Sequence, residues 1–223
     1  MIMKPHFTNA ATQATKVLMK YKVARTPVYP QQIIQASPIA TMISFADLAM
    51  FADVERSSIL EAMHEENDLA MTFVYKRPDG NPHYLFAFNR KKPIGEVRFA
   101  LAVELGHIYL GHTGYRDNET RFAESLCFTH HLIFPRPLIK LLQERGFAFT
   151  KKSFPRIFGE CVEFLDELVT SPSVTISAEL NRALKKQFIP YVDALADAGI
   201  LSLPADPSEQ LIDLSQYMQG YEE

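Results

Sequence analysis

The sequence contains few cysteines, no long apolar run and no secretory leader pattern. Cys127 and Cys161 are the only two cysteines in 223 residues, which excludes a disulfide scaffold and is typical of a reducing compartment. No apolar stretch approaches the roughly 18 residues of a membrane span. The first residues lack the apolar core and cleavage site of a signal peptide. We therefore expect a cytoplasmic protein that does not span a membrane.

The sequence also has no excess of positive charge. It has 23 basic and 26 acidic residues and a formal net charge of −3, so it lacks the broad positive field of proteins that bind nucleic acid without sequence specificity. We do not expect direct nucleic-acid binding. Glycine-rich phosphate loops, Cys-x-x-Cys pairs and nucleophile elbows are absent as well. The 47% hydrophobic content is nevertheless enough for a substantial core.

The order of hydrophobic patterns predicts an α+β fold. Two β-rich runs at 71–75 and 83–88 flank Asp79-Gly80, which predicts an antiparallel β-hairpin. Apolar residues recur at helical spacing on both sides of this hairpin. The expected helices cover 9–22, 30–36, 45–52, 59–65, 93–111, 118–133 and 137–145, a segment behind Pro155 that reaches Val169, and 177–198 with a break or kink at Pro190.

The segment Val103-Glu-Leu-Gly-His107 lies in the helix predicted over 93–111. A histidine at position 103 would complete a zinc-binding His-Glu-x-x-His motif, because positions i and i+4 share one helix face. The glutamate after the first ligand polarises a metal-bound water as a general base in such sites. Valine has no lone pair to donate, so the motif lacks one ligand. Glu104 without a metal has a simpler interpretation, a pairing with Arg98 or another hydrogen bond.

A second block follows downstream, at Glu124-Ser-Leu-Cys-Phe128-Thr-His-His-Leu132-Ile-Phe-Pro135. With both blocks in view, the chain resembles the ImmA/IrrE metallopeptidase family over about residues 25–140. That family shows Arg-Phe-Thr-Leu-Ala-His-Glu-Leu-Gly-His, then Glu-Ala-x-x-Phe-Ala-x-x-Leu-Leu-x-Pro. The first block is matched by Arg98, Phe99, Leu101, Ala102, Glu104, Leu105, Gly106 and His107. The second block is matched by Glu124, Phe128, Leu132 and Pro135.

The resemblance implies a zincin-like fold in which His107 and Glu124 bind zinc and Glu104 is the catalytic base. It also implies a regulatory system of a phage or mobile element, in which intact members act on a helix-turn-helix repressor. Val103 departs from the family pattern and puts zinc binding and proteolysis in doubt together. Loss of one ligand costs about 3 kcal/mol, or a factor of about 100 in affinity.

Four nearby side chains are candidates to replace the missing ligand: His112, Cys127, His130 and His131. If the helix continued, His112 would lie about 140° around it from His107 and about 7.5 Å along it. We therefore expect His112 to point away, Cys127 to be a core residue, His130 to face another side, and His131 to lie too far from the Glu124 carboxylate. None is expected to restore the site.

These observations lead to one main prediction and two alternatives. The main prediction is a zincin-like domain over 1–148, with a small antiparallel sheet against the motif helices, followed by a helical extension over 149–223. Its zinc site is degenerate and its proteolysis is crippled. The alternatives are an active zinc endopeptidase with a substitute ligand, and a noncatalytic protein that binds a protein partner.

Overall fold

The computed structural model describes residues 4–53, 69–112, 118–159, 164–201 and 209–222. The fold is α+β, as predicted. Its elements are α1 (Phe7–Lys20), α2 (Pro30–Ala36), β1 (Ala40–Ser44), α3 (Phe45–Ala52), β2 (Ala70–Lys76), β3 (Pro82–Phe88), α5 (Ile94–Tyr109), α6 (Asn118–Ile133), α7 (Arg136–Glu144), α8 (Phe154–Phe158), α9 (Leu165–Val169), α10 (Ala178–Asp197) and α11 (Ser215–Met218). The helix predicted over 59–65 and Cys161 lie outside the described residues.

The sheet has three strands in the order β1-β3-β2. The predicted hairpin is confirmed: β2 and β3 pair antiparallel, and Gly80 in the turn adopts a φ of 80° that glycine tolerates without strain. The prediction of a purely antiparallel sheet is wrong, because β1 pairs parallel to β3. This five-residue strand is too short to display a period, and its partner lies more than forty residues away in the sequence.

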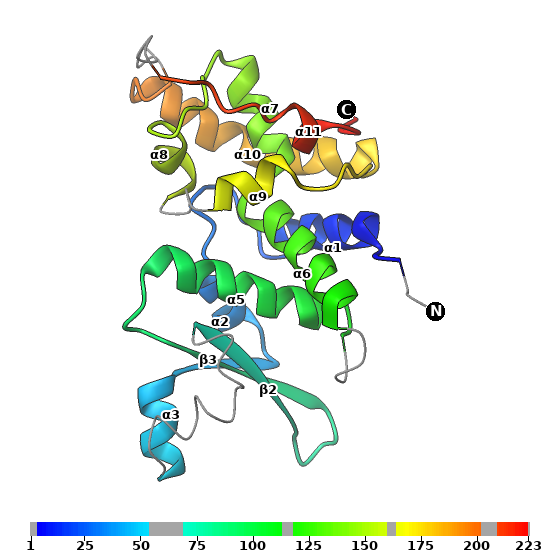
Figure 1. Ribbon diagram of the computed structural model, residues 1–223, viewed down its shortest axis with the longest axis vertical. Coiled ribbons are helices and arrows are strands. Elements are labelled where there is room, and N and C mark those ends of the chain that lie inside the picture. Colours follow the sequence, from blue (N-terminus) through cyan, green and yellow to red (C-terminus); the bar gives the residue numbers. More distant parts are fainter. Residues whose placement is uncertain (1–3, 54–68, 113–117, 160–163, 202–208, 223) are drawn as a thin grey trace.

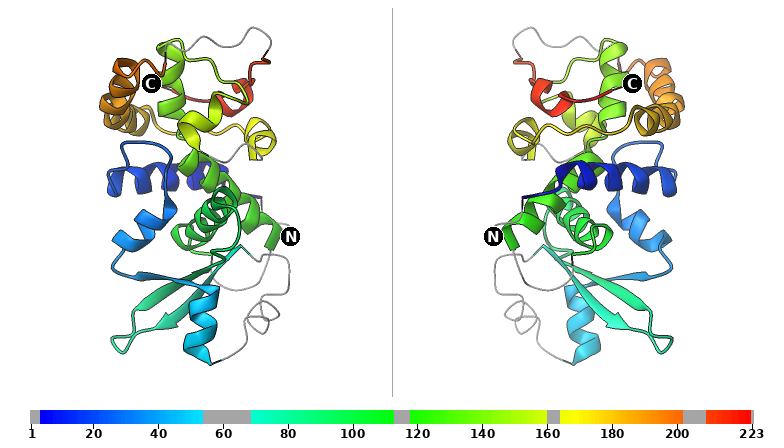
Figure 2. Two further views of the ribbon diagram at one scale, coloured as in Figure 1. Left: turned by 90° about the vertical axis from the view of Figure 1, so that its left-hand side faces the viewer. Right: turned by 90° about the vertical axis from the view of Figure 1, so that its right-hand side faces the viewer.

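Helix α5 lies on the sheet, and α6 packs along α5 (Figure 1). Close packing of the two helices depends on Gly106. A Cβ atom at this position would lie 3.1 Å from Ser125 Cα and 3.2 Å from the Phe128 ring. Helix α1 packs against α6, on the side of α6 away from the sheet (Figures 1 and 2). The two helices that carry the sequence motifs are therefore enclosed between the sheet and α1.

The C-terminal helices gather at the end of the molecule opposite the sheet (Figure 2). Buried Arg136 donates hydrogen bonds to the backbone carbonyls of Val174, over 2.6 Å, and of Gln219. The Tyr217 hydroxyl donates to the carbonyl of Phe134 over 2.7 Å. These contacts tie the last residues to α6 and α7. One buried hydrophobic cluster extends from α1 to α11, and the boundary at residue 148 stays a prediction.

Several predicted helices differ from the observed ones at their ends. Helix α1 begins at Phe7, with His6 as the N-cap, and not at residue 9. The apolar segment behind Pro155 contains two short helices, α8 and α9, because Gly159 adopts a φ of 74° and ends α8. Helix α10 continues through Pro190, so the helix does not break there, and the alternative of a kink stays a prediction. No helix among the described residues is long and apolar enough to cross a membrane.

Candidate functional site

Helix α5 carries the first motif and packs against both α6 and the sheet. Val103 and His107 are one helical turn apart and share a face. Val103 is only 7% exposed and belongs to the hydrophobic core. Since its side chain offers no lone pair, α5 itself contributes one ligand-type side chain at this face, the imidazole of His107.

The C-terminal end of α5 brings a second imidazole to the first. Gly111 adopts a φ of 69°, and its amide donates to the carbonyl of Ile108 over 3.1 Å. The amide of His112 donates to the carbonyl of His107 over 2.9 Å. This pair of bonds is a Schellman motif, which reverses the chain and returns the residue after glycine to the last helical turn. The expectation that His112 points away is therefore wrong, because the helix does not continue to it.

His112 lies between His107 and Glu124. Its Nδ1 is 3.0 Å from Nδ1 of His107, and its Nε2 is 2.9 Å from Oε2 of Glu124. A carboxylate only accepts hydrogen bonds, so Nε2 of His112 is the donor to Glu124. The backbone amide of His6 donates to the other carboxylate oxygen of Glu124 over 2.6 Å. The structure thus joins the end of α5, the middle of α6 and the start of α1 in one polar network.

The network is largely withdrawn from water. The side chains of His112 and Glu124 are 8% and 12% exposed. The pKa of His107 is lowered to about 4, chiefly by burial and to a lesser degree by electrostatic repulsion from His112 and Arg121. His107 is therefore neutral at pH 7, and a hydrogen bond joins its Nδ1 to that of His112. A neutral His107 is compatible with either hydrogen bonding or metal ligation.

The network does not have the geometry of a zinc site. Zinc requires donor atoms that converge on one point about 2.0–2.2 Å from each. Here one nitrogen of His112 contacts His107 and the other contacts Glu124. Both oxygens of Glu124 already accept hydrogen bonds. Val103 offers no donor. Within the described parts of the chain, no group of three or more His, Cys, Asp or Glu side chains is placed to hold a metal ion. In this arrangement the residues do not fit zinc.

Glu104, the residue expected to be the catalytic base, lies where α5 meets the sheet. Burial raises the pKa of its carboxyl to about 7, and hydrogen bonding to Thr72 of β2 opposes part of this shift. A carboxyl group poised near neutrality suits proton transfer. The same shift also arises for any glutamate that is buried against a strand, so the pKa alone assigns no role.

The remaining candidates take part in other contacts. The thiol of Cys127 lies 3.6 Å from the carbonyl of Phe7, and burial raises its pKa to about 12. Nδ1 of His130 is 2.5 Å from the Ser171 hydroxyl, and Nδ1 of His131 donates to the carbonyl of Cys127 over 3.0 Å. These three side chains are buried around α6, outside the network of His107, His112 and Glu124. The expectation that Cys127 is a core residue is confirmed.

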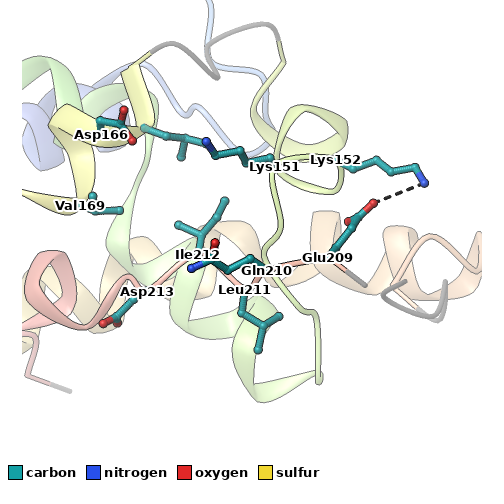
Figure 3. Close-up of a pocket in the computed structure, with 10 residues that line it drawn as sticks. Lys151, Lys152, Asp166, Val169, Glu209, Gln210, Leu211, Ile212 and Asp213 are labelled. Carbon is teal, nitrogen blue, oxygen red and sulfur yellow. Dashed lines mark ion pairs between the residues drawn. The ribbon is translucent and has the colours of Figure 1, made fainter. Parts of the chain in front are cut away.

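A cavity of about 530 Å³ opens in the C-terminal part of the molecule, and none of its lining residues belongs to this network (Figure 3). Leu165, Val169 and Ile212 form its apolar lining, and Lys152 pairs with Glu209 across 3.4 Å at its rim. Positively charged lysines and negatively charged carboxylates both line the cavity. This mixed rim does not specify a ligand of one charge.

A comparison of the chain with protein-family models, curated proteins and solved structures gives no match. The assignment of the site therefore depends on its residues and their geometry. Sequence reasoning identified His107 and Glu124, but it considered and rejected His112, and it did not find the amide of His6. Gly111 is the signal that points to His112, since a glycine just past the last helical turn predicts a chain reversal.

Proposed function

We propose that this chain is an ImmA/IrrE-like metallopeptidase-fold protein of a phage or mobile-element regulatory system, with a degenerate zinc site and crippled proteolysis. The arrangement of α5 and α6 against a hairpin supports the proposal, because both motif blocks then lie on two helices in direct contact. The chain's regulatory partner, on this proposal, is a helix-turn-helix repressor that it binds as a protein.

One observation supports the proposal that the zinc site is degenerate. The two ligand-type residues that match the family, His107 and Glu124, are both bonded to the same protein side chain, His112. The position of the missing ligand is filled by buried Val103. A site with two donors already engaged and a third lost has little affinity left for zinc.

The proposal is tested by the zinc content of the purified, untagged protein. We expect substoichiometric zinc in the wild type, and the same low value in Glu124→Ala. Val103→His combined with removal of the His112 imidazole is expected to create a zinc site on the same scaffold. A wild-type protein that holds one zinc per chain, and loses it in Glu124→Ala, would contradict the degenerate site.

A second candidate function has one specific observation in its favour. His112 lies beside both matched ligand positions, so rotation of its ring could direct one nitrogen to the same point as His107 and Glu124. The chain would then be an active zinc endopeptidase with His112 as the substitute ligand and Glu104 as the base. One zinc per wild-type chain, absent from both His112→Ala and Glu124→Ala, is the result that selects this candidate.

A further inference from the structure

Three helices are joined at the carboxylate of Glu124. One oxygen of Glu124 accepts from the amide of His6, just before α1, and the other accepts from His112, just after α5. His112 continues the connection to His107.

An imidazole ring is suited to the role of a bridge. Its two nitrogens lie on different sides of the ring, so one ring contacts two partners in different directions. A zinc ion likewise joins side chains from separate elements by contacting all of them. In this structure the ring of His112 contacts a side chain of α5 through Nδ1 and a side chain of α6 through Nε2.

The position of the bridge is fixed by the backbone. The Schellman motif at Gly111 returns His112 to the last turn of α5 with two backbone hydrogen bonds. The hydroxyl of Ser125 on α6 is 3.3 Å from Nδ1 of the same ring. The ring is therefore held from α5 and from α6.

We propose that the His112 imidazole replaces a metal ion as the cross-link between α5 and α6, and thereby excludes zinc from the site that the two helices would form. The identification of that site with a former zinc site rests on the function proposed above. Val103 is consistent with this role, because His112 already connects His107 to Glu124 and the connection does not require another metal-ligating side chain on α5.

The replacement predicts a specific order in which zinc binding can be regained. Val103→His alone supplies a third ligand, but the ring of His112 still lies between His107 and Glu124. Val103→His/His112→Ala removes that ring, so the imidazole introduced on α5 and the two matched residues are free to converge on zinc. We expect the double variant to bind zinc at least about 100-fold more tightly than the single variant.

The first measurement is zinc affinity by competition with a chelating dye, for wild type, Val103→His, His112→Ala and the double variant. His6→Ala is the matched control, since it removes an exposed imidazole and keeps the backbone amide that contacts Glu124. Tight binding in the double variant alone supports the proposal. Equally tight binding in Val103→His overturns it and leaves the proposed function intact. Absence of zinc binding in the double variant overturns both.

The second measurement is thermal unfolding in the presence of a chelator. His112→Phe keeps a ring and removes both nitrogens, and it is expected to lower the midpoint by about 5 °C. Added zinc is expected to leave the wild-type midpoint unchanged. An unchanged midpoint in His112→Phe, or a zinc-dependent rise in the wild type, overturns the cross-link even where His112→Ala fails to fold.

Discussion

The amide of His112 donates to the carbonyl of His107 over 2.9 Å, and the two rings meet at 3.0 Å between their Nδ1 atoms. A backbone contact and a side-chain contact thus join the same two residues. The backbone contact is the cause, because the reversal at Gly111 decides where the His112 side chain begins. The ring of His112, positioned in this way, donates its hydrogen bond to Glu124 on α6.

Gly111→Ala is predicted to destabilise the protein and to loosen this pair. The residue has a φ of 69° and open space around its missing Cβ, so the cost comes from the backbone and amounts to about 1–2 kcal/mol. Chemical denaturation measures the loss, and NMR of the histidine rings reports the pair. Gly199→Ala is the matched control: Gly199 has a φ of 71° and the same open space. Ring signals that change equally in both variants would contradict the prediction.

Gly106→Ala is predicted to lower stability by about 1 kcal/mol. Alanine in an unobstructed helix is favoured over glycine by about 1 kcal/mol. Here the new Cβ would lie 3.1 Å from Ser125 Cα, an atom of the α6 backbone that moves only with the helix. A shift of α6 away from α5 to make room for the methyl group costs about 1–3 kcal/mol, the usual range for overpacking in a protein core. A rise in the denaturation midpoint would show that α6 accommodates the methyl group without loss.

The contrast between Glu124 and His112 shows what the sequence could predict. Glu124 was identified because it matches the second block of the pattern that the chain resembles, and the structure places it on α6, which packs against α5. His112 was misplaced because a helical projection was applied beyond the residue at which the helix ends. β1 was missed for a related reason: five residues show no period, and strand pairing across long separations is a tertiary property.

The free energy of unfolding is predicted to fall as the pH decreases from 8 to 5. Burial lowers the pKa of His130 to about 4 and that of His131 to about 3, and Arg136 contributes to the shift of His131. At these two histidines the folded state therefore binds fewer protons than the unfolded state below about pH 6.5, and their combined effect outweighs the opposite one of Glu104, whose raised pKa favours the folded state at low pH. The stability is present above that pH and is lost as the pH falls toward 4. Each histidine contributes about 2 kcal/mol between pH 8 and pH 5.

Urea denaturation at several pH values checks this dependence. His131→Gln removes one of the two groups and is expected to reduce the difference in stability between pH 8 and pH 5 by about 2 kcal/mol. The substitution also changes packing, but this changes the stability by the same amount at every pH. The difference in stability between pH 8 and pH 5 therefore reports the loss of the titrating histidine. A wild-type protein equally stable at pH 5 and pH 8 would contradict the burial of neutral histidines in α6.

Glu104→Gln is predicted to stabilise the protein at pH 8 and to have a smaller effect at pH 5. The folded-state pKa of about 7 lies above the ordinary value of 4.5, so stability is fully present below pH 4.5 and is lost as the pH rises through 7. The neutral amide avoids this loss, a gain of about 3 kcal/mol at pH 8 and about 1 kcal/mol at pH 5. Urea denaturation at the two pH values measures both effects. Equal effects of Glu104→Gln at pH 5 and pH 8 would show that the carboxyl is ionised in the folded protein throughout this range.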